Sequence, residues 1–292
     1  MMIITNKHNY PVQLVEMAKA NERVPVVNKY SATELLKGTK EIVLTRRYFH
    51  ELEIDVSQLL WALWGQACHY IMEFPERERK DKMLEQILHL VNTEGQNTKL
   101  SAYGLSQKIA GIIQPNLDDG MVITEQRLYH RIGKNTVSGQ FDLLDKATNR
   151  LRDWKTASVY KVKKKDYDDW KKQGAIYAWL CKKNGIECKG ADFTALVKDF
   201  RPAEQRKERN YPQFPIVQVP PFNYTDKDLK RVEVGLTKKL AEINKTEEMD
   251  DDDIAPCTPK ERWKGTKCKS YCACNVKCNF YRENIAIGEL PF

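Results

Sequence analysis

Two short segments decide the fold, Gly139-Gln140-Phe141-Asp142 and, after a polar turn, Arg152-Asp153-Trp154-Lys155. Their β-branched and apolar surroundings predict two strands, residues 136–145 and 150–157. The turn between them, residues 146–149, is short enough to make the two strands neighbours. We therefore expect these two strands to lie side by side at the centre of the fold.

Acidic and basic side chains meet on this pair of strands. Asp153 and Lys155 share one strand face, roughly 7 Å apart at Cα, while Trp154 points to the opposite face. The preceding strand can set Asp142 beside Asp153. Two carboxylates and the main-chain carbonyl of Trp154 would make an oxygen cage suited to Mg²⁺ or Mn²⁺. Lys155 could then orient a metal-activated water or stabilise charge on a phosphate. The alternative is a surface hairpin with an ordinary Asp–Lys pair.

A helix predicted over residues 57–74 carries further candidate ligands. Its stripe at i, i+3 and i+4 spacing begins with small residues, which permit close approach to another element. His69 on this stripe presents a metal-ligand side chain, and Glu73 presents a carboxylate. The alternative for His69 is an exposed or hydrogen-bonded histidine without a metal. The stripe consists of Ala62, Gly65, Gln66, His69 and Glu73.

A second helix, predicted over residues 166–184, follows the strands and ends before Gly185. Its apolar stripe contains Trp170, Tyr177 and Cys181, and one polar residue, Gln173, interrupts it. A buried amide needs a hydrogen-bond partner, so Gln173 is either a site residue or a residue at the helix edge.

The remaining pattern predicts an α/β protein with a mixed central sheet flanked by helices. Further strands are expected over 121–132, 191–200 and 215–219, and further helices over 76–92 and 226–244. The expected organisation is a mostly helical region at 1–115, a core at 116–246, and a linker with a cysteine-rich tail at 247–292. The N-terminal region also shows a capping box at Ser31-Ala-Thr-Glu34.

Composition favours a nucleic-acid partner. The formal net charge is +8. A basic cluster that includes Lys161, Lys163 and Lys164 is typical of phosphate-backbone binding, although a solvated lysine-rich surface is the alternative. No apolar run approaches the roughly 20 residues of a membrane-spanning helix, and no secretory signal is evident. There is no Gly-rich loop ending in Lys-Ser/Thr, which argues against an NTP-driven motor. We therefore expect a cytoplasmic protein with no membrane partner.

Five of the eight cysteines lie between residues 257 and 278. Because disulfides are rare in the cytosol, this clustering favours a metal centre. Four thiolates suit either a structural Zn²⁺ or an iron–sulfur cluster. A bound metal would stabilise a tail too short to build a core of its own. The preferred ligands are Cys257, Cys268, Cys272 and Cys278, with Cys274 as the spare, and Cys181 and Cys188 are expected to be ordinary buried or partly buried residues.

The ordered motifs Gly65-x3-His69-x3-Glu73, Gly139-x2-Asp142, Asp153-x-Lys155 and Gln173-x3-Tyr177 resemble the RecB/Cas4-like branch of the PD-(D/E)XK nucleases and its phage relatives. Each motif is short, but their order and spacing over about 57–282 are specific together. The resemblance implies a restriction-endonuclease-like core and Mg²⁺- or Mn²⁺-dependent hydrolysis of DNA. It also implies an exonuclease of recombination, repair or phage DNA processing, in a bacterium or a phage-infected host.

Carried over to this sequence, the resemblance implies metal ligation by His69, Asp142, Asp153 and the Trp154 carbonyl, with Lys155 as the catalytic lysine. Gln173 and Tyr177 would position that lysine or the DNA strand. Independently of the resemblance, the basic cluster with Lys161, Lys163 and Lys164 is expected to hold the strand's backbone. Glu125 would be an accessory acidic residue, as would Glu73. Phe141 stands where the motif's proline is often found, a departure common in this branch.

The resemblance also implies a [4Fe–4S] cluster that joins the C-terminal tail to the core. Cys68 is an alternative upstream ligand for it. The usual Cys-x2-Cys spacing is absent, so structural Zn²⁺ stays open. Expected partners are single-stranded DNA or duplex ends, and a helicase, recombinase or single-strand-binding protein. The alternative function is a non-catalytic nucleic-acid-binding module with the same fold, stabilised by a bound metal.

Overall fold

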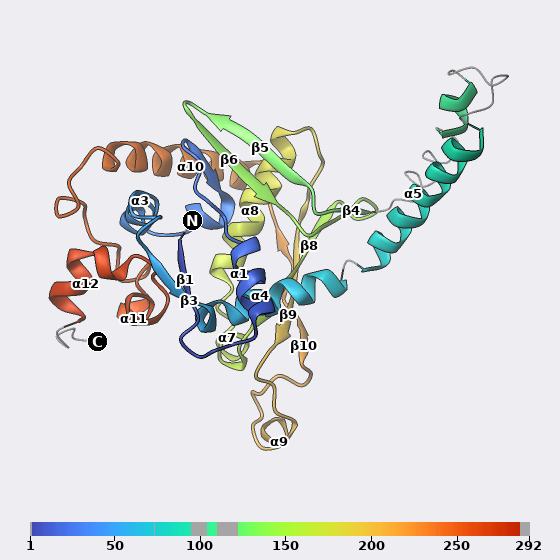
Figure 1. Ribbon diagram of the computed structural model, residues 1–292. Helices are drawn as coiled ribbons and strands as arrows, with labels where there is room; N and C mark the ends of the chain where they lie inside the picture. Colours follow the sequence, from blue (N-terminus) through green and yellow to red (C-terminus); the bar gives the residue numbers. More distant parts are fainter. Residues whose placement is uncertain (1, 73, 95–103, 110–121, 287–292) are drawn as a thin grey trace.

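The computed structural model describes residues 2–72, 74–94, 104–109 and 122–286. Three sheets and the helices around them form the body of the protein (Figure 1). The strands are β1 (Ile3–Thr5), β2 (Lys29–Ser31), β3 (Glu53–Asp55), β4 (Val122–Thr124), β5 (Arg127–Ile132), β6 (Asn135–Gln140), β7 (Leu143–Asp145), β8 (Arg150–Ala157), β9 (Gly190–Val197), β10 (Ile216–Gln218) and β11 (Phe222–Asn223).

The helices match the predicted ones closely where the pattern was long, because an apolar stripe over several turns is a strong signal. The helices are α1 (Val12–Ala20), α2 (Ala32–Leu35), α3 (Thr39–Arg47), α4 (Val56–Met72), α5 (Phe74–Glu94), α7 (Val159–Lys164), α8 (Asp168–Lys183), α9 (Pro202–Gln205), α10 (Asp226–Thr246), α11 (Thr266–Ser270) and α12 (Asn279–Asn284), with short 3₁₀ turns η1 (Trp263–Gly265) and η2 (Asn275–Lys277). Among the described helices, none combines the length and apolar character that crossing a membrane requires.

The central sheet is mixed, as predicted. Its strand order is β10-β9-β8-β7-β4, with β11 also pairing with β9. β8 and β9 run parallel and are connected through α7 and α8, whereas β7 is antiparallel to both β8 and β4. The expected α/β class with a mixed sheet and flanking helices is thereby confirmed.

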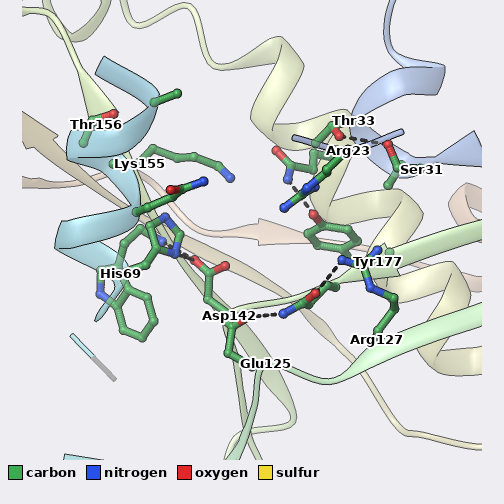
Figure 2. Close-up of a pocket in the computed structure, with 18 of the residues that line it drawn as sticks. Arg23, Ser31, Thr33, His69, Glu125, Arg127, Asp142, Lys155, Thr156 and Tyr177 are labelled. Atoms are coloured by element: carbon green, nitrogen blue, oxygen red, sulfur yellow. Dashed lines mark hydrogen bonds and ion pairs between the residues drawn. The ribbon is translucent and has the colours of Figure 1, made fainter. Parts of the chain in front are cut away.

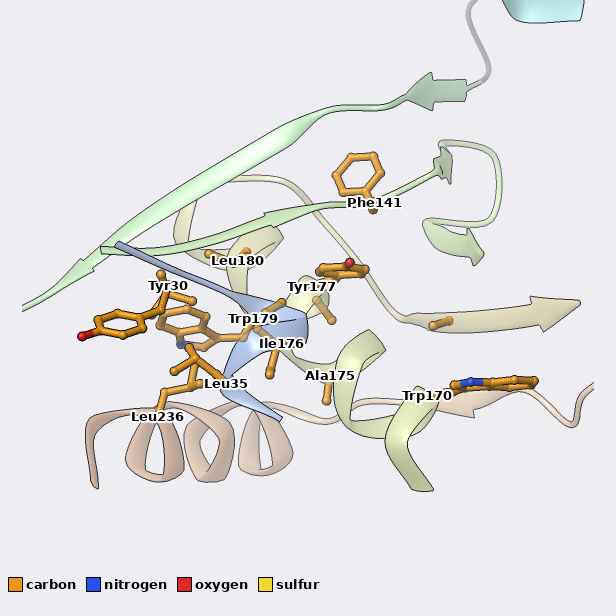
Figure 3. Close-up of a cluster of buried hydrophobic side chains, with 14 of the residues drawn as sticks. Tyr30, Leu35, Phe141, Trp170, Ala175, Ile176, Tyr177, Trp179, Leu180 and Leu236 are labelled. Carbon is orange, nitrogen blue, oxygen red and sulfur yellow. The ribbon is translucent and has the colours of Figure 1, made fainter. Parts of the chain in front are cut away.

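A second sheet, of order β2-β6-β5, lies across α8 from the central sheet. α8 contacts β9 on one side and β5, β6 and α10 on the others. Figure 3 shows the resulting core, in which Trp179 and Leu180 of α8 pack among buried side chains from α2, β6 and α10. Both of these α8 side chains are essentially inaccessible to solvent. Since α8 is enclosed on several sides, it is a rigid support for any polar residue that it carries.

Two predicted strands are each divided in two. The strand expected over 121–132 is β4 and β5, interrupted at Glu125, and the strand expected over 136–145 is β6 and β7, interrupted at Asp142. The Glu125 backbone is left-handed, with φ of 51°, and its N–H donates to the Asp142 carbonyl over 3.0 Å. Residues 124–127 are all polar, but a short polar run does not reveal that the chain passes from one sheet to the other there.

The N-terminal region is not independent of the core. β2 pairs in parallel with β6, and β1 pairs with β3 beside the start of α4. The predicted capping box is present at α2: Glu34 N–H donates to the Ser31 hydroxyl over 3.2 Å. The division into regions 1–115, 116–246 and 247–292 stays a prediction.

The C-terminal tail is fastened to α3 by one buried lysine. Lys40 is only 2% exposed. Its ammonium donates to the carbonyls of Asp251 and Ile254, over 3.0 and 2.8 Å, and to Asn279 Oδ1 over 2.6 Å. A buried ammonium needs such partners, so this contact joins the linker and the tail to the body of the protein.

Candidate active site

An open pocket of about 520 Å³ lies between α4, the ends of β6 and β8, and α8 (Figure 2). The motif residues that line it come from four segments far apart in the sequence. They are Gly65, His69, Gly139, Asp142, Trp154, Lys155, Gln173 and Tyr177. The structure therefore brings these motif residues together at one cavity, and Asp153, which does not itself line it, contacts Lys155.

Asp153 and Lys155 form a buried ion pair on β8. Lys155 Nζ lies 2.6 Å from Asp153 Oδ1, and the Asp153 side chain is 4% exposed. Burial raises the pKa of Asp153 to about 6, with a further increase from the charge of Asp142, while Lys155 opposes the shift. Burial lowers the pKa of Lys155, but the charges of Asp153 and Asp142 outweigh it and raise that pKa above its usual value.

Asp142 sits at the break between β6 and β7 and connects β8 with α4. Its Oδ2 accepts a hydrogen bond of 3.0 Å from the Trp154 N–H, and His69 Nδ1 lies 3.2 Å from the same oxygen. This contact raises the pKa of His69, against the effect of burial. The Trp154 ring meets the His69 ring edge-on at a centroid distance of 6.4 Å, which helps to orient the imidazole.

Glu125 completes a group of possible metal ligands. One ligand atom each from His69, Glu125 and Asp142 lies within 4.8 Å of the others. The Glu125 carboxylate is held by the Gln140 amide, and its backbone is held by the Asp142 carbonyl. The left-handed backbone at Glu125 directs this exposed residue toward Asp142, and a strand pattern gives no sign of such a turn.

The donor set fits a hard divalent cation. Carboxylate oxygens with one imidazole nitrogen are ligands that Mg²⁺ and Mn²⁺ accept. Apart from the ion pair with Lys155, neither buried oxygen of Asp153 receives a hydrogen bond from the described part of the chain. A buried carboxylate short of donors is costly, and a bound cation beside it would remove that cost.

The sequence indicated that a buried Gln173 would need a hydrogen-bond partner. In the structure that partner is Tyr177, one turn further along α8. Gln173 Nε2 donates to the Tyr177 hydroxyl over 2.7 Å, and both residues are buried. Burial raises the pKa of Tyr177, so the phenol stays protonated at neutral pH. Both residues line the pocket opposite α4, beside Lys155.

Sequence reasoning missed two arginines in the same pocket, Arg23 and Arg127. Arg127 donates to the Gln140 amide oxygen, which continues the chain of contacts that holds Glu125. Arg23 makes no ion pair with any residue in the described ranges, and Ser31 and Thr33 lie near it (Figure 2). Arg23 precedes β2 in an irregular segment, so no periodic pattern could place it here.

The lysine cluster lies elsewhere. Lys161, Lys163 and Lys164 are on α7 and are not among the residues that line the pocket. Lys161 pairs with Asp169 at 2.8 Å, and Lys163 pairs with Glu208. The accessory acidic residue expected at Glu73 falls outside the described residues.

All five tail cysteines line a second, small cavity of about 30 Å³ between α3 and the tail. Cys272 Sγ lies 3.6 Å from Cys274 Sγ, and Cys257 packs so closely on Gly38 that a Cβ there would lie 2.5 Å from its sulfur. Burial raises the pKa of Cys257 to about 11, and the contact with Cys274 lowers the pKa of Cys272. Cys274 is the most buried of the five, and among the described residues no three cysteine sulfurs lie within 4.8 Å of one another. Cys68 lies on α4, and it is not among the residues that line this cavity.

Comparisons with known proteins agree with this architecture. A model of the PD-(D/E)XK nuclease superfamily matches residues 45–279. A search of curated proteins finds no match. The solved structure of SSO0001 has a TM-score of 0.50 at 14% identity, covering 92% of this chain and 95% of that one, which shows a shared fold. Two other solved structures score lower.

The first of these is an alkaline exonuclease from Laribacter hongkongensis, with a TM-score of 0.31 and 15% identity over 58% of this chain and 81% of that one. The second is a phage-related exonuclease from Haemophilus somnus 129PT, with a TM-score of 0.30 and 12% identity over 57% of this chain and 81% of that one. The family match confirms the sequence resemblance at the level of the superfamily.

Proposed function

The chain belongs to the PD-(D/E)XK nuclease superfamily, and on that premise we propose that it is a Mg²⁺- or Mn²⁺-dependent deoxyribonuclease. The proposed site consists of His69, Asp142, Asp153 and Lys155, with the Trp154 carbonyl as a further oxygen ligand. We further propose an exonuclease that acts in recombination, repair or phage DNA processing. That setting is an inference from the resemblance, since fold alone does not determine function.

One observation carries this proposal. The buried Asp153–Lys155 pair lies directly beside Asp142 and His69 at the wall of an open pocket. Keeping an aspartate and a lysine buried together is costly, and a binding surface has no need of it. Strongly perturbed titratable groups that converge in a cleft are the usual mark of a catalytic site.

When bound, the divalent ion neutralises charge on a phosphate oxygen and lowers the pKa of a coordinated water. The chain's own groups then have distinct tasks. Asp142, at the break between β6 and β7, and Asp153, on β8, hold negative charge at fixed positions. Lys155, charged because its pKa is raised, donates a hydrogen bond to the attacking water or to the phosphate in its transition state. The water oxygen would bond to phosphorus, the bond from phosphorus to the 3′ oxygen would break, and one proton of the water would end on that 3′ oxygen, giving a 5′-phosphate and a 3′-hydroxyl.

Residues on the opposite wall of the pocket would position the DNA strand. The Tyr177 hydroxyl, fixed by Gln173, faces the space between Lys155 and the arginines. Arg23 and Arg127 present cations to the flanking phosphates of the strand, which suits the bidentate geometry of guanidinium groups. Lys161, Lys163 and Lys164 on α7 would hold backbone farther from the point of cleavage.

The cysteine cavity supports a second element of the proposal. Cys257, Cys268, Cys272 and Cys278, with Cys274 as the spare, would hold a [4Fe–4S] cluster or Zn²⁺ that fastens the tail to α3. A helicase, recombinase or single-strand-binding protein is the class of partner that such an exonuclease would serve.

The test is degradation of end-labelled DNA in Mg²⁺ or Mn²⁺ by the purified full chain, with and without EDTA. Asp153→Asn and Lys155→Met remove the two charges at nearly constant volume, and both are expected to lose activity by at least about 100-fold. Lys189→Met and Glu187→Gln, which alter an exposed ion pair, should retain it. DNA binding without cleavage by the parent protein, unaffected by EDTA, would instead establish the non-catalytic binding module.

A further inference from the structure

The pocket is bordered by large aromatic side chains that the proposed hydrolysis does not use. Trp61 and Tyr70, both on α4, line the pocket although their residues are 54% and 62% exposed. Exposing an indole to water forgoes the free energy that its burial would contribute. Two such aromatic side chains on the lining of one charged cavity, and not their exposure alone, point to a ligand surface.

The position of Trp61 follows from the helix stripe that carries His69. Trp61, Gly65 and His69 are spaced four residues apart, so they lie along one side of α4. A Cβ at Gly65 would lie 3.5 Å from Thr156 Oγ1, which shows that this side faces β8. The two turns between Trp61 and His69 correspond to roughly 12 Å of helix axis. Trp61 is thus beside the candidate metal site but too far along the helix to contact the same phosphate.

A cation packs over one face of the Trp61 ring. Lys198 Nζ lies 4.0 Å from the ring centroid, and Lys198 itself is exposed at the end of β9. The indole is thereby held in place by a cation–π contact, and the ammonium is available to a phosphate of a strand lying across it. An aromatic ring with adjacent cations is the arrangement that binds unstacked bases together with their backbone.

We propose that Trp61 is a stacking platform for a base of single-stranded DNA, so that the pocket takes a single strand as its substrate. A base can stack on Trp61 only if it has left its neighbours in the helix, which a single strand permits at little cost. Tyr70, next to His69, would contact the strand on the other side of the cleaved phosphate. This inference rests on the proposed function for the identity of the ligand as DNA, but its test measures binding alone.

The experiment compares two tryptophans on the same helix. Trp64 is also 54% exposed and is not among the residues that line the pocket, so Trp64→Ala is a matched control for Trp61→Ala. Binding of a labelled single-stranded oligonucleotide is measured by fluorescence anisotropy in EDTA, where cleavage is absent. Trp61→Ala is expected to raise Kd about tenfold, and Trp61→Phe to restore most of the affinity. Trp64→Ala is expected to leave Kd unchanged.

A second arm uses an oligonucleotide of equal length in which a central tract of nucleotides is abasic. This strand keeps its phosphates but has no bases to stack. The parent protein should bind it more weakly, and Trp61→Ala should cause no further loss. Equal losses for Trp61→Ala on both strands, equal Kd values for Trp61→Ala and the parent, or tighter binding of blunt duplex of the same length would each overturn the proposal. If the parent protein bound the single strand as expected but did not cleave it, the proposed hydrolysis would be contradicted. The stacking role of Trp61 would be unaffected.

Discussion

Gly139 on β6 lies directly against Tyr177 on α8: a Cβ at Gly139 would come within 2.8 Å of the tyrosine ring and 2.7 Å of Leu180 Cδ1. The contact lets the helix approach the strand closely enough to place the Tyr177 hydroxyl in the pocket. The glycine of the motif therefore has a packing role, and its effect on the site passes through Tyr177.

Gly139→Ala is expected to destabilise the protein by about 2 kcal/mol, since the added methyl group overpacks a rigid core. Cleavage should fall by more than the loss of folded protein explains, because Tyr177 and Gln173 must move. Urea denaturation and cleavage rates under fully folded conditions separate the two effects. Gly65→Ala is the control: a Cβ there meets Thr156 at an ordinary 3.5 Å, so activity should persist.

Metal affinity should depend on pH through Asp153. Its pKa in the folded protein is about 6, above the reference value of 3.8, so folding favours the protonated acid. In the metal-free protein this stabilising contribution is complete below about pH 4 and is lost as pH rises through about 6. Asp153 must be ionised and His69, whose pKa is also raised, must be neutral to bind a metal, so Mn²⁺ affinity should fall by more than about tenfold per pH unit below pH 6.

Calorimetric titration with Mn²⁺ between pH 5 and pH 8 measures this dependence. Asp153→Asn should weaken Mn²⁺ binding and reduce its dependence on pH, because the amide cannot ionise. Equal Mn²⁺ affinity for the parent at pH 5 and pH 7.5 would exclude Asp153 as a ligand.

The tail cysteines should bind one metal centre per chain. Anaerobically purified protein is expected to contain either one Zn²⁺ or iron with inorganic sulfide, as metal analysis can determine. Cys272→Ser should lose the metal and lower the thermal midpoint, whereas Cys188→Ser, outside the cavity, should retain both. Metal-free parent protein with an unchanged thermal midpoint would show that the five thiols are free.

Removing the Lys40 ammonium should weaken the attachment of the C-terminal tail to α3. Lys40→Met leaves three acceptors without their donor and is expected to cost about 3 kcal/mol of stability. Lys37→Met, which removes an exposed charge 3.8 Å from Glu41, should cost less than about 0.5 kcal/mol. Limited proteolysis should cut the linker after residue 246 faster in Lys40→Met than in the parent or in Lys37→Met. Equal rates in all three proteins would contradict this role of Lys40.

Local rules explain which features were predictable. The strand period places Asp153 and Lys155 on one face, and the helix period places Gln173 one turn before Tyr177, so both pairs follow from the chain alone. The capping box at Ser31 likewise depends on residues three apart. The errors arose at the breaks at Glu125 and Asp142, because the local pattern does not show that the chain changes sheets at these residues.

The sequence by itself determined the class of fold, the order of the motifs and the short-range geometry within each strand or helix. The resemblance suggested that His69, Asp142 and Glu125 share a site, but only the tertiary structure decided the turn that directs Glu125 to Asp142 and the presence of Arg23 and Trp61 in the same pocket. These contacts join segments separated by tens of residues or more. Such contacts depend on how sheets and helices pack around α8, and packing between distant elements leaves no periodic trace in a single sequence.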